Sequence, residues 1–226
     1  MLNLCKYFGN YFSIQSFLTT FAVQLLIYMK DKIINIATNL FLKLGFKSVT
    51  MDDIACEMCI SKKTIYKYFG NKEELIYEGT ATIQTHMEHT INLIVSKNFN
   101  AIVENFEIRK MFNEMFKSAG TSPLYQLKKH YPEIYTTIRN RQVKECKRCF
   151  TKNIEKGIAE GLYRTELNIP MVVKFYYELI FSINDQDASE AEISSMEYHA
   201  LEYHIRALAT PQGIIELEKN KINTLL

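Results

Sequence analysis

Apolar residues recur every three to four positions along most of this chain, which is the spacing of one face of an α-helix. The pattern is clearest after Met29, where it predicts a helix of about three to four turns. Gly45 follows this stripe, and glycine favours the left-handed conformation in which many helices end. The stripe consists of Ile33, Ala37, Leu40, Phe41 and Leu44.

Capping residues mark the starts of two later helices. Thr50 and Asp53 have the spacing of a capping box, with Asp in place of the usual Glu or Gln, and they predict a helix over about 51–58. Asn71, with Glu74 three residues on, opens a long fourth helix.

Between these two helices, Ser61 is placed to cap a third helix over 61–69. Ile65 and Phe69, four positions apart, would be buried on one side of it. Three helices with a tight turn between the second and the third form a helix-turn-helix unit.

Prolines and glycines divide the rest of the chain into further helical segments, and no alternating strand pattern appears. These helices are expected near 100–118, 123–130, 132–160, 170–183, 190–209 and 211–220. We therefore predict an all-α fold of about nine or ten helices, with a trihelical DNA-binding domain before a larger helical bundle. The expected division is an N-terminal extension over 1–28, a helix-turn-helix domain over 29–75 and a larger helical domain over 76–226.

Charge sharpens this prediction in one segment. The whole chain has a formal net charge of only +2, but residues 61–72 contain four lysines and no acidic residue. If Ile65 and Phe69 point inward, the third helix presents lysines and hydroxyl groups outward, which suits phosphate oxygens and base edges. The outward residues are Lys62, Lys63, Thr64, Tyr66 and Lys67.

The same region resembles the DNA-binding domain of the TetR family of one-component regulators. The resemblance spans 29–76 and continues more weakly to the C-terminus. Cys59 stands in the bend where many relatives carry glycine or another small residue, and a positive φ there would cost energy. The matching residues are Ala37, Leu40-Phe41, Gly45-Phe46, Thr50-Met-Asp-Asp-Ile-Ala55, Ile60 to Leu75, Glu160 to Arg164 and Ala209 to Gly213.

The resemblance implies a transcriptional regulator, usually a repressor, that binds double-stranded operator DNA as a homodimer. Thr50 and Lys72 would then bind phosphates, the latter at the positive end of the fourth helix. The start of the third helix would face the bases, and its later residues would contact phosphates or a thymine methyl group. The expected DNA-binding set is Thr50, Ser61, Lys62, Lys63, Thr64, Tyr66, Lys67, Tyr68 and Lys72.

The resemblance also implies that the larger domain dimerises and holds a small apolar or amphipathic effector. Residues 171–181 are apolar nearly all round, so this helix must be buried on most sides, either by a partner subunit or within a monomeric core. The candidate dimer residues are Val172, Phe175, Leu179, Met196, Ala200 and Leu208. The candidate effector-binding residues are Phe112, Phe116, Tyr125, Tyr135, Phe150 and Tyr176, although aromatic residues at helical spacing also form ordinary cores.

Two Cys-x-x-Cys pairs, at Cys56 and Cys59 and at Cys146 and Cys149, leave a redox or metal sensor open as an alternative. Cys146 lies in an apolar stripe, where a thiol acts as a small hydrophobic group. We expect no metal and no cofactor. No nucleophile elbow, phosphate loop or carboxylate pair supports an enzyme, so a helical enzyme or small-molecule carrier is the weakest alternative.

The first 28 residues are apolar but interrupted by polar side chains, which fits neither a membrane span nor a secretory leader. We expect Met29 to be the natural start, with a short amphipathic helix packed on the body as the second interpretation. Five cysteines, an odd number, favour reduced thiols and a cytoplasmic protein with no membrane association.

Overall fold

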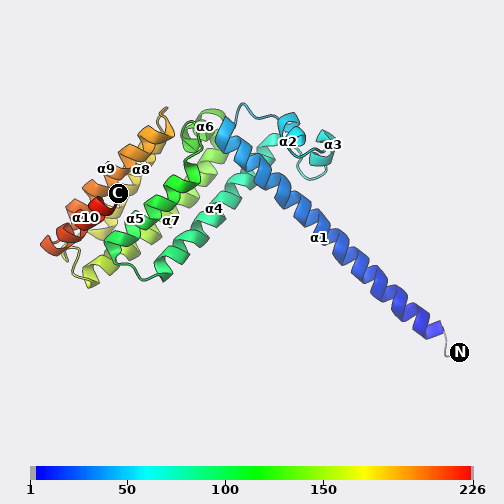
Figure 1. Ribbon diagram of the computed structural model, residues 1–226, viewed down its shortest axis with the longest axis horizontal. Helices are drawn as coiled ribbons and strands as arrows, with labels where there is room; N and C mark the ends of the chain where they lie inside the picture. The colour runs from blue at the N-terminus through cyan, green and yellow to red at the C-terminus, as the bar shows by residue number, and fades with distance from the viewer. Residues whose placement is uncertain (1–3, 225–226) are drawn as a thin grey trace. The chain divides into compact units, whose positions relative to one another are not determined.

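The computed structural model describes the backbone of residues 4–224 and the side chains of residues 20, 21 and 23–221. Within that part of the chain, helices are joined by loops and turns, and the β-structure is one isolated bridge between Tyr163 and Ala209 (Figure 1). The predicted all-α fold is confirmed. The helices are α1 (Leu4–Leu44), α2 (Met51–Glu57), α3 (Lys62–Ile65), α4 (Lys72–Ser96), α5 (Ala101–Phe116), α6 (Pro123–His130), α7 (Pro132–Ala159), α8 (Ile169–Asn184), α9 (Glu190–Leu208) and α10 (Pro211–Thr224).

Residue contacts divide the chain into two compact units. The smaller unit, called the reading unit below, contains Met1–Asn39 and Thr50–Gly79. The larger unit, called the body, contains Leu40–Val49 and Thr80–Leu226. The end of α1 and the loop after it thus make their contacts with the body, although the reading unit both precedes and follows them in the sequence.

The first helix is much longer than predicted, because α1 has 41 residues and already begins at Leu4. No glycine or proline occurs between Asn10 and Leu44, so nothing in that span interrupts the helix. The described side chains from Thr20 to Tyr28 are exposed. The second interpretation, a short helix over 1–28 packed on the body, concerns mainly side chains outside the described residues. Of the helices that the structure describes, none combines the length and the hydropathy needed to cross a bilayer.

The reading unit is built from α1, α2, α3 and the start of α4, and its short helices are held by local caps. The Thr50 N–H donates to the Asp53 carboxylate at 2.8 Å, and the Asp53 N–H donates to Thr50 Oγ1 at 3.1 Å. This reciprocal pair is the predicted capping box. The Glu74 N–H donates to the Asn71 side chain at 2.8 Å, which confirms the predicted cap of α4.

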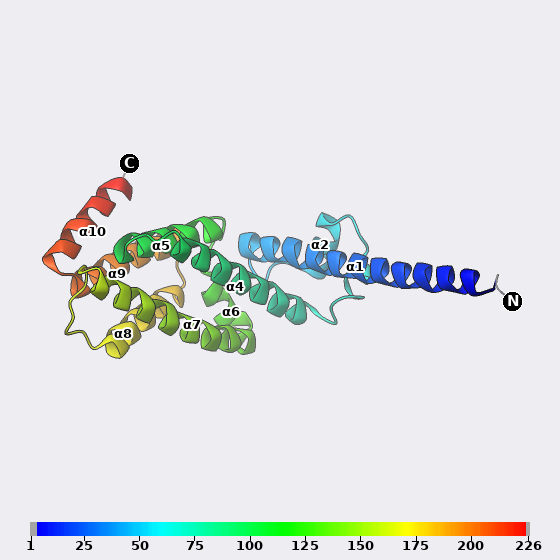
Figure 2. The ribbon, with the colours of Figure 1, turned by 90° about the horizontal axis from the view of Figure 1, so that it is seen from below.

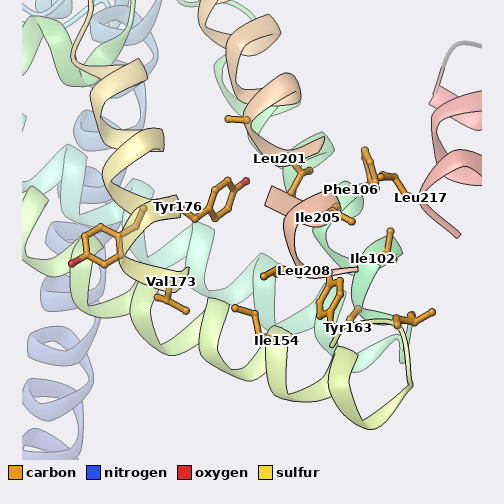
Figure 3. Packing of buried hydrophobic residues seen from close by; sticks show 14 of the residues in the cluster. Ile102, Phe106, Ile154, Tyr163, Val173, Tyr176, Leu201, Ile205, Leu208 and Leu217 are labelled. Carbon is orange, nitrogen blue, oxygen red and sulfur yellow. The ribbon is translucent and has the colours of Figure 1, made fainter. Parts of the chain in front are cut away.

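In the body, α7 packs against α5, α6 and α8, while α9 packs against α5 and α8 (Figure 2). A cluster of buried apolar residues lies among these helices, and Figure 3 shows Ile102, Ile154 and Tyr163 within it. Gly157 makes one close approach possible, because a Cβ atom there would overlap the ring of Tyr163.

A buried polar network crosses the same core. Asn105 Nδ2 donates to Asn153 Oδ1 at 2.8 Å and to the Tyr163 hydroxyl at 3.3 Å. Asn153 Nδ2 donates in turn to the Glu104 carboxylate at 2.8 Å. Buried polar groups are costly unless they are hydrogen-bonded, so this network fixes the positions of α5 and α7 against each other.

Candidate DNA-binding face and effector cavity

The third helix is shorter than the predicted nine residues. α3 has four residues, and Ser61 caps it by accepting the Thr64 N–H at 3.1 Å. After Ile65 the chain continues as hydrogen-bonded turns, because the Lys67 and Tyr68 N–H groups bond to carbonyls three residues back. Such bonds are typical of 3₁₀ geometry, which tightens the ends of helices.

The predicted division into inner and outer side chains holds over this segment. Ile65 is 0% exposed and Phe69 is 1% exposed, so both belong to the core of the reading unit. The exposed side chains are Ser61, Lys62, Lys63, Tyr66 and Lys67, while Thr64, Tyr68 and Lys72 are half-buried. A surface of lysines, hydroxyl groups and an aromatic ring therefore faces outward on one short segment.

One carboxylate lies close to this surface, a feature that was missed when α3 was considered alone. The Lys62 ammonium pairs with Asp52 of α2 at 2.7 Å, and this hydrogen bond raises the pKa of Lys62. Lys72 lies at the start of α4, where burial lowers its pKa. Thr50 is exposed at the cap of α2, with its hydroxyl bonded to Asp53 at 2.7 Å.

The turn between α2 and α3 contains a strained residue. Cys59 has a φ of 54°, in the left-handed region that glycine adopts more easily than other residues. The Cys59 and Ile60 N–H groups both bond to carbonyls of α2, which holds this conformation in place. The positive φ considered at this bend is therefore present.

The body encloses a cavity of about 370 Å³. Its walls come from α4 to α9, and Leu42 and Phe46 from the end of α1 and the following loop also line it. Most of the lining is apolar, as in sites that bind small organic molecules. Four of the predicted effector residues line the cavity: Phe112, Phe116, Phe150 and Tyr176.

The other two predicted effector residues do not line this cavity. The Tyr125 hydroxyl donates to Asp187 at 2.7 Å, and the Tyr135 hydroxyl donates to Asp185 at 2.8 Å. Both tyrosine hydroxyls point to the loop after α8, because carboxylates in that loop accept hydrogen bonds from them.

Phe46 is held in the cavity wall by hydrogen bonds to its backbone. Its N–H donates to Gln126 Oε1 of α6 at 2.9 Å, and its carbonyl accepts from the Tyr131 hydroxyl at 3.3 Å. Sequence pattern could not reveal these contacts, which join residues 80 and 85 positions apart.

The predicted dimer residues fall into two groups. Phe175 is 66% exposed and Leu179 is 38% exposed, four positions apart on α8. Ala200 and Leu208 are buried in the core of their own subunit, so their proposed place at an interface is wrong. Val172 and Met196 are half-buried against that core. The apolar stripe of α9 is explained by packing within one chain.

Among the described residues, the thiols and histidines are not gathered into a cluster that could hold a metal ion. No group of three potential ligands occurs there. Burial raises the pKa of Cys146 to about 12 and that of Cys149 to about 11, which disfavours the reactive thiolates. His204 is buried and stacks on the Tyr176 ring at 3.9 Å, so it has a packing role.

Comparison with known proteins agrees with this geometry. Residues 33–78 match the family model for bacterial regulatory proteins of the tetR family. The negative transcriptional regulator IcaR of the biofilm operon icaADBC from Staphylococcus epidermidis is 27% identical over an alignment covering 51% of this chain and 68% of the relative. For the Staphylococcus aureus regulator of the same name, identity is 29%, and the alignment covers 50% of this chain and only 54% of the relative.

Solved structures extend the similarity of fold over most of the chain. A transcriptional regulator from Cytophaga hutchinsonii superposes with a TM-score of 0.66 at 18% identity, covering 80% of this chain and 98% of that structure. The regulatory protein TetR from Rhodobacter sphaeroides superposes with a TM-score of 0.66 at 12% identity, covering 79% and 98%.

A capped helix-turn-helix with a lysine-rich outer surface, followed by a helical body, defines a DNA-binding transcriptional regulator and not an enzyme. The helix-turn-helix segment of the chain matches the TetR family of these regulators, and the fold of the chain is similar to that of solved transcriptional regulators.

Proposed function

We propose that this regulator is a homodimeric repressor that leaves its operator when a small molecule fills the cavity of the body. The observation that carries the DNA-binding part is the exposed surface of Lys62, Lys63, Tyr66 and Lys67 above buried Ile65 and Phe69. The relatives named as negative regulators support repression as the mode of action. A repressor of this kind works in the cytoplasm, where its operator lies.

Lys62, Lys63 and Thr64 are the residues proposed to face the bases in the major groove. Lysine donates to guanine O6 and N7, and the start of the segment after a helix-turn-helix bend is the part that reaches base edges. Lys62 must first exchange Asp52 for the DNA, a modest cost because both side chains are exposed. Ser61 caps α3 and supports this geometry.

Thr50, Tyr66, Lys67, Tyr68 and Lys72 are proposed to contact the DNA backbone, with the tyrosines also able to pack on a thymine methyl group. Such contacts position the protein without selecting a sequence. The two classes of contact should therefore respond differently to mutation.

DNA binding by the full chain tests this assignment. Replacing Lys72 by Ala should weaken binding to all DNA and reduce the slope of log affinity against log salt by about one. Lys63→Ala should also change the preferred sequence, with about a tenfold loss on the best site. Fluorescence anisotropy measures both effects after a native operator has been selected from genomic DNA. Lys110→Ala, an exposed lysine of α5, is the control. Unchanged affinity and slope in both test variants would remove the proposed surface.

Effector release is supported by the residues that line the cavity. Leu42 and Phe46 belong to its wall, and only three residues separate Phe46 from Thr50, the cap of α2. A molecule that fills the cavity can favour one position of this loop over another. The effect on DNA affinity is then limited by the difference in ligand affinity between the two conformations.

The exposed apolar side chains of α8, namely Met171, Phe175 and Leu179, support a homodimer through this helix. They lie at i, i+4 and i+8, and a two-fold interface uses the same patch on both subunits. Sedimentation without DNA tests this: Phe175→Asp should shift the protein to monomers. Glu178→Asp, on the same helix, should leave it dimeric. A monomeric wild-type protein would contradict the proposal.

A further inference from the structure

The charged side chains that line the cavity fall into two groups: some form ion pairs within the protein, and the others do not. Ten charged residues line it, and six of them form three ion pairs within the protein. Arg141 pairs with Glu88 at 3.0 Å, and Lys156 pairs with Glu104 at 2.7 Å. The third pair is Arg148 with Glu145. These six residues require no charge from a ligand.

The two remaining basic groups in the lining are Lys152 and Arg109. Lys152 is exposed, so water solvates its ammonium group. The Arg109 guanidinium donates to the Ser194 carbonyl at 2.8 Å and to the Ser194 hydroxyl at 3.2 Å. It also lies over the Tyr198 ring, 5.0 Å from the centroid, and Tyr198 does not line the cavity. These contacts hold one end of the Arg109 guanidinium toward α9, while its Nε–H is buried with no hydrogen-bond partner.

Both remaining acidic groups, Glu190 and Glu197, lie on α9 seven positions apart, which places them on one face of the helix. Asn184 Nδ2 donates to one oxygen of Glu197 at 2.6 Å. Among the described residues, no lysine, arginine or histidine nitrogen lies within 4.0 Å of either carboxylate.

Neither carboxylate has a basic group close by in the part of the chain that the structure describes, and the pKa of both is raised. Burial raises the pKa of Glu190 to about 7, and the nearby Glu197 carboxylate adds to this effect. Burial also raises the pKa of Glu197, although Asn184 and the more distant Arg109 charge act against it. A cationic group in the cavity would stabilise the ionised form of both.

A buried amide oxygen in the cavity also favours a ligand that carries a hydrogen-bond donor. Gln142 of α7 lines the cavity, and its Oε1 atom is buried with no hydrogen-bond partner. A buried acceptor that lacks a donor costs free energy, and a ligand that brings a donor removes this cost. Gln142 and the two carboxylates of α9 thus offer acceptors to a ligand that carries donors and positive charge, and Arg109 Nε is the one unpaired donor beside them among the described residues of the lining.

We propose that the cavity binds a lipophilic organic amine in its protonated form, with the ammonium group at Glu190 and Glu197 and the apolar body against Phe112, Phe116 and Phe150. Aromatic rings near such a group add cation–π attraction. The inference rests on the proposed function only in treating this cavity as the effector site. It names the class of effector.

Three probes of similar shape test the sign of the charge: 4-phenylbutylamine, 4-phenylbutanol and 4-phenylbutanoate. Their binding to the full-length protein is measured by calorimetry at pH 8, where Glu190 is ionised and the amine is protonated. The amine should bind roughly tenfold more tightly than the alcohol, because a hydrogen bond to a charged group replaces a neutral one. The carboxylate should bind most weakly.

Variants connect that preference to the two carboxylates. In a protein carrying both Glu190→Gln and Glu197→Gln, the amine should lose its advantage while the alcohol keeps its affinity. Glu155→Gln, an exposed residue of α7 outside the cavity, should keep the preference and is the matched control. The retained affinity for the alcohol also shows that the double variant is folded.

Tightest binding of the carboxylate, equal binding of amine and alcohol, or no binding of any probe would each overturn the inference. Anisotropy on operator DNA is measured separately. An amine that binds but leaves DNA bound would contradict effector release and leave the ligand class intact. If an anionic or neutral molecule releases the protein from DNA and the amine is not preferred, effector release is supported and the proposed ligand class is wrong.

Discussion

The two units of this regulator handle charge in opposite ways. In the reading unit, Lys63 and Lys67 are exposed on a short segment, where no buried group depends on them. In the body, the charges that line the cavity are largely paired inside the protein, as with Lys156 and Glu104. The first arrangement suits a long polyanion that supplies its own counter-charge, whereas the second leaves only a few groups to select a small molecule.

The two units also differ in how far apart in the sequence their hydrogen-bonded residues lie. The polar contacts that define the reading unit join Thr50 to Asp53 and Ser61 to Thr64, each three residues apart. Those of the body join Asn105 to Asn153, 48 residues apart, and Phe46 to Gln126, 80 residues apart. The body therefore depends more on the precise packing of distant helices, and three substitutions test this difference.

The largest effect is expected where α7 approaches the core. Replacing Gly157 by Ala should lower the free energy of unfolding of the body by about 3 kcal/mol, because the new methyl group overlaps the buried Tyr163 ring. Gly120→Ala is the control, since nothing lies near its Cβ position, and it should change stability by less than about 0.5 kcal/mol. Urea denaturation measures both. If the two variants are equally stable, the core can accommodate the added methyl group at this position without loss of stability.

A smaller effect on the free energy of unfolding is expected when the pH is lowered. Burial lowers the pKa of His204 from its usual 6.5 to about 4, so the folded state binds a proton less readily than the unfolded state. Its contribution is present above pH 6.5 and is lost as the pH falls toward 4. At pH 5 the wild type should have lost about 2 kcal/mol relative to His204→Phe, which keeps a ring against Tyr176.

Glu190 opposes this trend, because its pKa is raised and its protonation stabilises the folded state as the pH falls from 7. Both proteins contain Glu190, so the difference between their unfolding curves at pH 7 and pH 5 isolates His204. Parallel pH profiles would contradict the assigned burial of the imidazole.

The smallest effect is expected in the reading unit. Cys59→Gly should raise the free energy of unfolding by about 0.5 kcal/mol, because relief of the left-handed strain slightly exceeds the entropy that glycine costs. Cys56→Gly, at an exposed helical position of α2, should instead lower it by about 0.3 kcal/mol. Thermal unfolding of the two variants compares these opposite signs. A loss of stability in both would mean that the bend carries no strain.

The local features of the reading unit could be predicted from sequence, because caps and burial at i and i+4 depend on neighbouring residues. The capping box at Thr50 and the burial of Ile65 and Phe69 were predicted for this reason. The length of α3 was not, since 3₁₀ bonds after Ile65 compete with α-helical bonds at little cost. The Lys62–Asp52 pair joins two helices and needed their relative positions.

In the body, helix bounds could be predicted but the partners of each face could not. α6 has the predicted bounds of 123–130, since prolines and a serine cap mark its surroundings. Tyr125 was nevertheless assigned to the cavity and Ala200 to an interface, because an aromatic or apolar stripe does not say which neighbour covers it. Buried charges such as Glu197 were missed, because nothing in the local pattern separates them from surface acids.

Phe46 constrains how this regulator can diversify. Its side chain forms part of the cavity wall, its backbone is held by Gln126 and Tyr131, and the cap of α2 follows it closely. Under the proposed function, a change at Phe46 should alter ligand choice and the coupling to DNA together, so a redesign of sensing should begin at Phe112 or Phe150 and leave this loop untouched.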